Sequence, residues 1–139
     1  MADIIFSSFP KYLGDGTIDL DNDTLKCMLL TESYTIDATD TVVVDLGSVE
    51  VSGTGYTAGG VSLTGVSWET AGTTTTLDFN DAQWSNASFT ARYAVIYDDT
   101  PTSPADPLIC LFDFGSNQTV SNGTFTIQFN ASGVISITT

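Results

Sequence analysis

The side chains of this 139-residue chain that could do chemistry are carboxylates, because the sequence contains no histidine. That absence excludes Ser-His-Asp and Cys-His catalysis and histidine-ligated zinc. The most suggestive acidic spacing is Asp19-x-Asp21-x-Asp23, which matches the alternating carboxylates of a calcium loop. Thr24 stands where that loop needs its turn glycine, and Leu30 stands where it needs its bidentate glutamate. We interpret the triplet as a solvated turn, with weak adventitious calcium binding as the alternative.

Two further segments have compositions found in ligand sites. The glycine-rich run Gly53–Gly60 lacks the lysine of a phosphate loop and leads into a strand at Val61 instead of a helix. We expect a turn that brings Tyr56 against a sheet. Trp68 and Trp84 could form a platform for sugar rings, but we favour core packing, which is more common for aromatic residues in strands. The sequence thus predicts no catalytic residue, no metal ligand and no cofactor.

The charge of the chain restricts its partners. Seventeen acidic side chains against three basic ones give a formal net charge of −14. Lys11, Lys26 and Arg92 cannot form a basic stripe along phosphates, so binding to nucleic acid or to an anionic membrane is disfavoured. No apolar stretch approaches the ~18 residues of a membrane-spanning helix, and the N-terminus lacks the pattern of a signal peptide. We therefore expect synthesis in a cytoplasm.

The two cysteines are predicted to be unpaired thiols in the core. Cys27 and Cys110 each lie in an apolar run of strand length, where cysteine behaves as a small hydrophobic residue. A chain made in a reducing compartment keeps its thiols free. A single disulfide between them is the alternative.

Residues 1–14 are predicted to form an N-terminal arm or short helix. Phe6, Phe9 and Leu13 follow a helical spacing, whereas Pro10 favours a single helical turn preceded by an extended segment. The arm collects apolar side chains, and we regard them as a candidate contact with a partner. Capping of the open end of the fold is the alternative. The candidate contact residues are Ile4, Ile5, Phe6, Phe9 and Tyr12.

The rest of the chain reads as short strands. Ile18 and Leu20 predict a strand in a hairpin with Leu25–Leu30, which is apolar enough to be buried on both faces. Residues 31–60 are expected to be a long loop with fragments of strand, and residues 81–86 a link between strands. Further strands are predicted around residues 61–68, 73–79, 89–97 and 108–114, with a tail hairpin that pairs residues 125–129 with 134–137.

Seven to eight strands, with turn residues about every ten positions, predict an all-β fold. We expect one domain over residues 1–139, an antiparallel β-sandwich that is jelly-roll-like or a small barrel.

Four segments together carry a resemblance that spans nearly the whole chain. They are Ile18-Asp19-Leu20-Asp21 leading into Thr24-Leu25-Lys26-Cys27-Met28-Leu29-Leu30-Thr31, Gly53-Thr54-Gly55-Tyr56-Thr57-Ala58-Gly59-Gly60-Val61, Ala91-Arg92-Tyr93-Ala94-Val95-Ile96-Tyr97, and Phe125-Thr126-Ile127-Gln128-Phe129 before a glycine hairpin. In these segments the chain resembles a family of small virion structural proteins of tailed bacteriophages.

Members of such families are similar to capsid decoration (cement) proteins, which lie on the outside of the head and tie neighbouring capsomers together. The resemblance implies a non-enzymatic protein made in the host cytoplasm and located on the outer capsid surface of the virion. Its expected partners are the major capsid protein and copies of itself, with a homotrimer favoured because capsid lattices offer three-fold positions. A tail-tip or fibre-associated protein and a carbohydrate-binding module are the alternatives, since sandwich folds serve all three roles.

Overall fold

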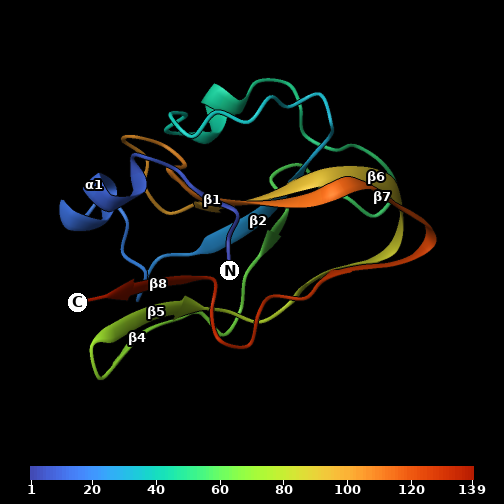
Figure 1. Ribbon diagram of the computed structural model, residues 1–139. Helices are drawn as coiled ribbons and strands as arrows, with labels where there is room; N and C mark the ends of the chain where they lie inside the picture. Colours follow the sequence, from blue (N-terminus) through green and yellow to red (C-terminus); the bar gives the residue numbers. More distant parts are fainter.

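The computed structural model describes all 139 residues, and strands make up most of its regular structure (Figure 1). Eight strands, one α-helix and one 3-10 helix follow one another along the chain. They are β1 (Ile4–Ile5), α1 (Phe9–Gly14), β2 (Leu25–Leu30), η1 (Val43–Leu46), β3 (Val61–Ser62), β4 (Ser67–Ala71), β5 (Thr74–Asp78), β6 (Ala82–Asp98), β7 (Leu108–Ile127) and β8 (Ile135–Thr138).

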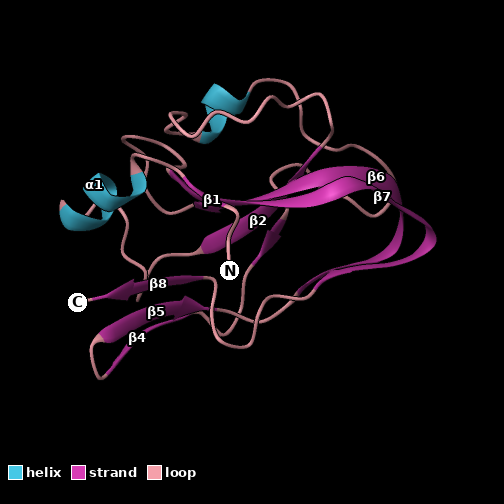
Figure 2. Cartoon of the chain, in the orientation of Figure 1, coloured by secondary structure: helices cyan, strands magenta, loops and turns pink.

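The strands form two antiparallel sheets that face each other as layers (Figure 1). The larger sheet has the order β1-β7-β6-β2-β3 and the smaller one the order β4-β5-β8. Both helices lie at the periphery (Figure 2). The chain is therefore an open antiparallel sandwich and not a closed barrel, which confirms the predicted all-β class.

The strands β6 and β7 form one long, curved hairpin, with 17 and 20 residues respectively. They pair with each other along their length and bend round one side of the molecule, from the larger sheet toward the smaller one (Figure 1). Their register shifts between Trp84 and Ala87 and again between Ala87 and Phe89. Extra residues at such bulges increase the twist and bend a strand. Asn86 and Asn122 supply the left-handed backbone at the bend, with φ of 50° each, which asparagine tolerates better than most residues.

The larger sheet buries side chains on both faces. Cys27 and Leu29 of β2 belong to the cluster between the two sheets, whereas Met28 and Leu30 belong to a second cluster on the opposite face. The loop that contains η1 covers this second cluster (Figure 1). Burial of β2 on both faces and a long loop over residues 31–60 were both predicted, and both predictions are confirmed.

Strand order keeps the two cysteines apart. Cys27 on β2 and Cys110 on β7 are both opposite Ile96, which lies on β6 between them. Two strand spacings separate Cα atoms by roughly 10 Å, whereas a disulfide requires less than about 7 Å. Both thiols are free and fully buried, and burial raises the pKa of each. The prediction of unpaired core thiols is confirmed.

This arrangement sets an expectation for thiol labelling. Alkylation in denaturant without reductant should add two labels per chain, counted by mass spectrometry, whereas the native protein should resist labelling because both thiols are buried and protonated. A chain that accepts labels only after reduction would contain a disulfide and contradict this arrangement.

The predicted tail hairpin is wrong. Strand β8 pairs with β5, where Ile135 is opposite Leu77, and residues 125–127 end β7 and pair with β6. Alternating apolar residues identify a strand and its buried face but fit any partner with the same alternation. The predicted link over residues 81–86 is also wrong, since Ala82 already begins β6.

The predicted first hairpin is also wrong, because only its second strand exists. Ile18 and Leu20 are buried, but they lie in a turn and not in a strand. The Asp19 carboxylate accepts hydrogen bonds from the N–H groups of Asp21 (3.1 Å) and Asn22 (3.2 Å), which folds the backbone back on itself.

At the N-terminus, the extended segment followed by one helical turn is the alternative that the structure adopts, as β1 and α1.

Candidate functional site

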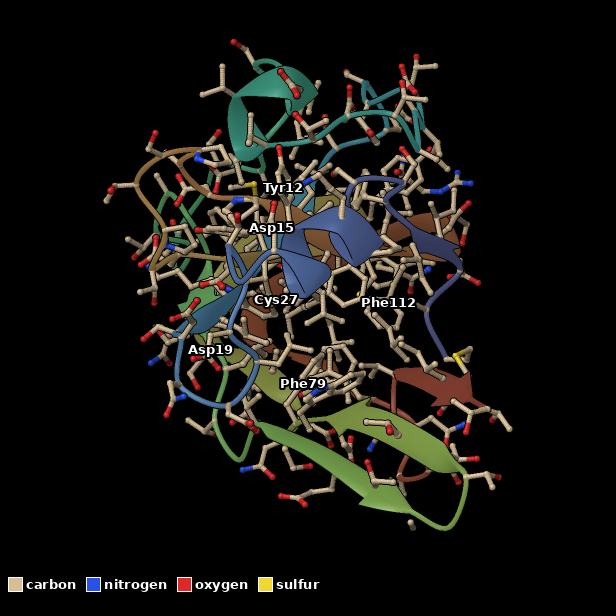
Figure 3. The ribbon with its side chains drawn as sticks, turned by 90° about the vertical axis from the view of Figure 1, so that its left-hand side faces the viewer. Tyr12, Asp15, Asp19, Cys27, Phe79 and Phe112 are labelled. Carbon is tan, nitrogen blue, oxygen red and sulfur yellow. The ribbon has the colours of Figure 1, made fainter.

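The N-terminal arm is integrated into both cores. Ile4 and Ile5 form β1 on the outer edge of β7. Phe6 is fully buried in the cluster under the long loop, while Phe9 is buried in the cluster between the sheets, against which Tyr12 also packs. Helix α1 covers the end of the sandwich opposite the bend of β6 and β7, with Tyr12 labelled on it in Figure 3. Of the five candidate contact residues, Ile5 alone is well exposed, at 43%.

The acidic turn after α1 engages its own backbone. Asp19, seen at the periphery in Figure 3, also accepts a hydrogen bond from the Asn22 side-chain amide at 2.8 Å. That bond, followed by the backbone N–H groups of the turn, lowers the pKa of the Asp19 carboxyl. No three His, Cys, Asp or Glu side chains lie close enough together to hold a metal ion.

Asp98, at the end of β6, differs from all the other aspartates because its side chain is fully buried. Its Oδ1 atom accepts the N–H of Thr100 at 3.1 Å, but no N–H or hydroxyl group donates to its Oδ2 atom. Burial, followed by a hydrogen bond with the neighbouring Asp23 carboxyl, raises the pKa of Asp98 to about 8. Asp23 in turn accepts the N–H of Asp19 at 3.1 Å. A protonated Asp98 can donate to Asp23, which joins the acidic turn to the end of β6.

The glycine-rich turn brings Tyr56 against the sheet, as predicted. The Tyr56 hydroxyl accepts the N–H of Leu29 at 3.0 Å and donates to Glu50 at 2.7 Å. Glu50 also accepts the N–H of Gly59 at 2.7 Å, and the Tyr97 hydroxyl donates to the Gly59 carbonyl at 2.7 Å. Burial raises the pKa of Tyr56, so this hydroxyl stays a donor at all physiological pH values. The network attaches the turn to β2 and β6.

Removing the Tyr56 hydroxyl should destabilise the fold. In Tyr56→Phe the Leu29 N–H and the Glu50 carboxylate both lose a partner in a half-buried site, which costs about 1–3 kcal/mol of unfolding free energy. Chemical denaturation measures the change. Tyr12→Phe is the matched control, since the Tyr12 hydroxyl makes no hydrogen bond. Equal stability of the two variants would contradict a structural role for the network.

The two tryptophans do not form a platform for sugars. Trp84 is buried, with its ring 6.3 Å from that of Tyr56 and 5.9 Å from that of Phe125. Trp68 is partly buried against the same cluster. Core packing, the interpretation that we favoured for these residues, is confirmed.

A groove along β7 is the feature that the sequence analysis missed. Two adjoining hollows of about 360 and 400 Å³ share Phe114, Ile127 and Gln128 and follow β7 and the residues after it. We call them together the β7 groove. Its walls contain four half-buried phenylalanines, and Figure 3 labels Phe112, one of them, together with Phe79, the residue that follows β5. The four are Phe112, Phe114, Phe125 and Phe129.

No protein-family model, no curated protein and no solved structure matches this chain.

Neither helix of the structure is long and apolar enough to cross a membrane. Two carboxylates line the β7 groove, and each is engaged by a neighbouring group. Asp113 bonds to Arg92 at 3.0 Å, which lowers the pKa of Asp113, and Asp3 accepts the Asp113 N–H at 2.8 Å. Away from these carboxylates, the groove offers a partner aromatic rings and neutral polar groups.

Proposed function

We propose that this chain is a non-enzymatic structural protein of a tailed-bacteriophage virion. In this proposal it is a capsid decoration protein that binds the outer face of the head and stabilises contacts between capsomers. Its partners are the major capsid protein and copies of itself, with a trimer at three-fold positions of the lattice. It binds neither nucleic acid nor membrane.

The observation that carries the proposal is the position of the four segments that resemble phage virion proteins. Leu25–Leu30 is the buried strand β2, and Gly53–Val61 forms the turn attached through Tyr56. Ala91–Tyr97 lies in β6 at the centre of the larger sheet, and Phe125 lies beside the groove at the end of β7. The resemblance thus concerns the framework of the sandwich, which supports a common scaffold.

The charged residues support the choice of partners. Each of the three basic side chains already pairs with an aspartate: Lys11 with Asp15 at 3.0 Å, Lys26 with Asp99 at 3.3 Å, and Arg92 with Asp113. No basic side chain is left unpaired to bind a phosphate backbone, which favours a protein partner over nucleic acid. A surface of charge −14 also repels packaged DNA.

Immunogold labelling of particles that contain the protein, followed by cryo-electron microscopy, tests the proposal. We expect gold on heads and extra density at three-fold positions of the shell. Label confined to tails would replace the proposal by a tail-tip or fibre-associated protein. A monomer that binds a glycan array and never heads would replace it by a carbohydrate-binding module.

The exposed part of the arm is expected to touch the shell. Ile5→Ser should change the free energy of unfolding by less than about 1 kcal/mol, because 43% of this residue is already exposed, but should weaken head binding several-fold. Co-sedimentation with undecorated heads measures the binding. Val44→Ser, at an 85% exposed position of η1, is the control and should bind as the wild type does. Equal binding by both variants would make the arm purely structural.

A further inference from the structure

We propose that the β7 groove and the adjacent outer edge of β7 form the surface through which two copies of this chain bind each other. The inference rests on the proposed function in one respect, that the protein acts as a homo-oligomer. It adds the surface that the copies use.

The outer edge of β7 is open over most of its length. One side of β7 pairs with β6, but on the other side β1 covers only Cys110 and Leu111. Residues 112–127 have no neighbouring strand on that side. Exposed edges are usually protected by lysine or proline, and this stretch contains neither. Bulges curve the edge, so a partner would contact it mainly through side chains in the groove.

The aromatic rings of the groove are held in place by the core and are open to a partner. The Phe129 ring lies 4.7 Å from that of Phe79 and 5.3 Å from that of Phe112. The Phe125 ring lies 5.2 Å from that of Phe89. Because these contacts fix the rings before binding, little side-chain entropy is lost when a partner covers them. Partly buried aromatic rings along a groove give side chains of a partner a surface to pack against.

The distribution of charge indicates where two copies of this chain can meet. All 17 acidic and three basic side chains lie within the first 113 residues, so the last 26 residues, from Phe114 to Thr139, carry no charged side chain. Copies with a charge of −14 repel one another, so a self-contact is most favourable where charge is absent. The core of an interface is likewise poor in charged residues and rich in aromatic ones. Both carboxylates of the groove, Asp3 and Asp113, lie in the hollow nearer Met1, and the hollow lined by Gln118 and Phe125 contains none.

Added charge in the groove should separate the copies. In the double variant Gln118→Glu/Gln128→Glu, both substituted residues are exposed and line the groove. Sedimentation equilibrium should show an oligomer for the wild type and a dissociation constant raised at least about tenfold for the variant. Higher salt should strengthen wild-type association, because it shortens the range of the repulsion, which is about 10 Å at 0.1 M salt.

The control is Thr35→Glu/Ser48→Glu, which adds the same charge at exposed positions of the long loop on the other face of the larger sheet. It should associate as the wild type does, and circular dichroism should show that all the variants are folded. A monomeric wild type, or equal association by the two variants, would overturn the proposal. So would a groove variant that stays oligomeric but no longer binds heads, since the shell would then be the occupant.

These outcomes separate the surface from the function. Loss of the oligomer in the groove variant, combined with gold on tails, would support the interface between copies and contradict the proposed capsid role. Gold on heads, combined with a wild type that is monomeric in solution, would support the capsid role and contradict the interface between copies.

Discussion

Raising the pH from 5 to 9 is expected to lower the melting temperature of this protein, and Asp98→Asn should remove most of that fall. Burial and the adjacent Asp23 carboxyl raise the pKa of Asp98 from 3.8 to about 8. Between these values the unfolded chain has released a proton that the folded chain still holds. Each pH unit in this window therefore lowers the free energy of unfolding, by up to about 1.4 kcal/mol, and the loss is complete above about pH 8.

The surroundings of Asp98 give the deprotonated carboxylate little compensation. Burial, followed by the nearby Asp99 carboxylate, raises the pKa of Asp106, and Lys26 is already paired with Asp99. At high pH, Asp98 loses the proton that it can donate to Asp23, and the acidic turn would lose this link to β6.

Asparagine at position 98 keeps a donor for Asp23 without a titrating group. Asp98→Asn should therefore melt at nearly the same temperature at pH 5 and pH 9. Asp21→Asn is the matched control, since it removes a charge from an exposed side chain in the same turn and should retain the wild-type pH profile. An unchanged slope in Asp98→Asn would show that another group controls the pH dependence.

Gly60→Ala is expected to prevent folding or to lower the melting temperature by more than about 10 °C. A Cβ atom at Gly60 would overlap the Cys27 carbonyl group and lie 2.9 Å from the Met28 Cα atom. Both obstacles belong to the backbone of β2, which is buried on both faces and cannot move without disturbing both cores. The φ angle of Gly60, +82°, is also unfavourable for alanine.

Gly14→Ala is the control for this substitution. Gly14 ends α1, has no atom within 4 Å of the added Cβ, and does not need a positive φ. Its melting temperature should stay the same or rise slightly, because alanine favours a helix more than glycine does. Soluble Gly60→Ala with the wild-type melting temperature would contradict the close packing of the glycine-rich turn on β2.

The local pattern of apolar and polar residues was sufficient to predict where strands lie and which of their faces are buried, but not which strands pair with each other. The continuous apolar run of β2 correctly predicted burial on both sides, and glycine spacing correctly predicted a turn beneath Tyr56. The pairing of β8 with β5 joins residues about 60 positions apart, and no local signal distinguishes β5 from β7 as the partner. The bend at Asn86 was interpreted as a turn because asparagine and serine favour turns and bulges alike.

The candidate site was predictable in composition but not in arrangement. The sequence shows the apolar character of the arm, yet only the structure shows that Phe6 and Phe9 enter different cores while Ile5 stays exposed. Residues 125–129, which contain Phe125 and Phe129, were predicted to form one strand of a tail hairpin with residues 134–137. With β8 paired elsewhere, Phe125 and Phe129 line an open groove instead. The uncharged C-terminal stretch was a visible signal that could have indicated this surface.

The long hairpin of β6 and β7 also governs how the molecule loses its structure. These two strands run through the larger sheet and then curve toward the smaller one (Figure 1), and their buried side chains share one core cluster with Leu77 of β5 and Ile135 of β8. Neither layer can separate without exposing the core cluster that both of them bury. Heat or denaturant should therefore melt the two sheets in a single cooperative transition, with the slowest amide exchange along the shared strands.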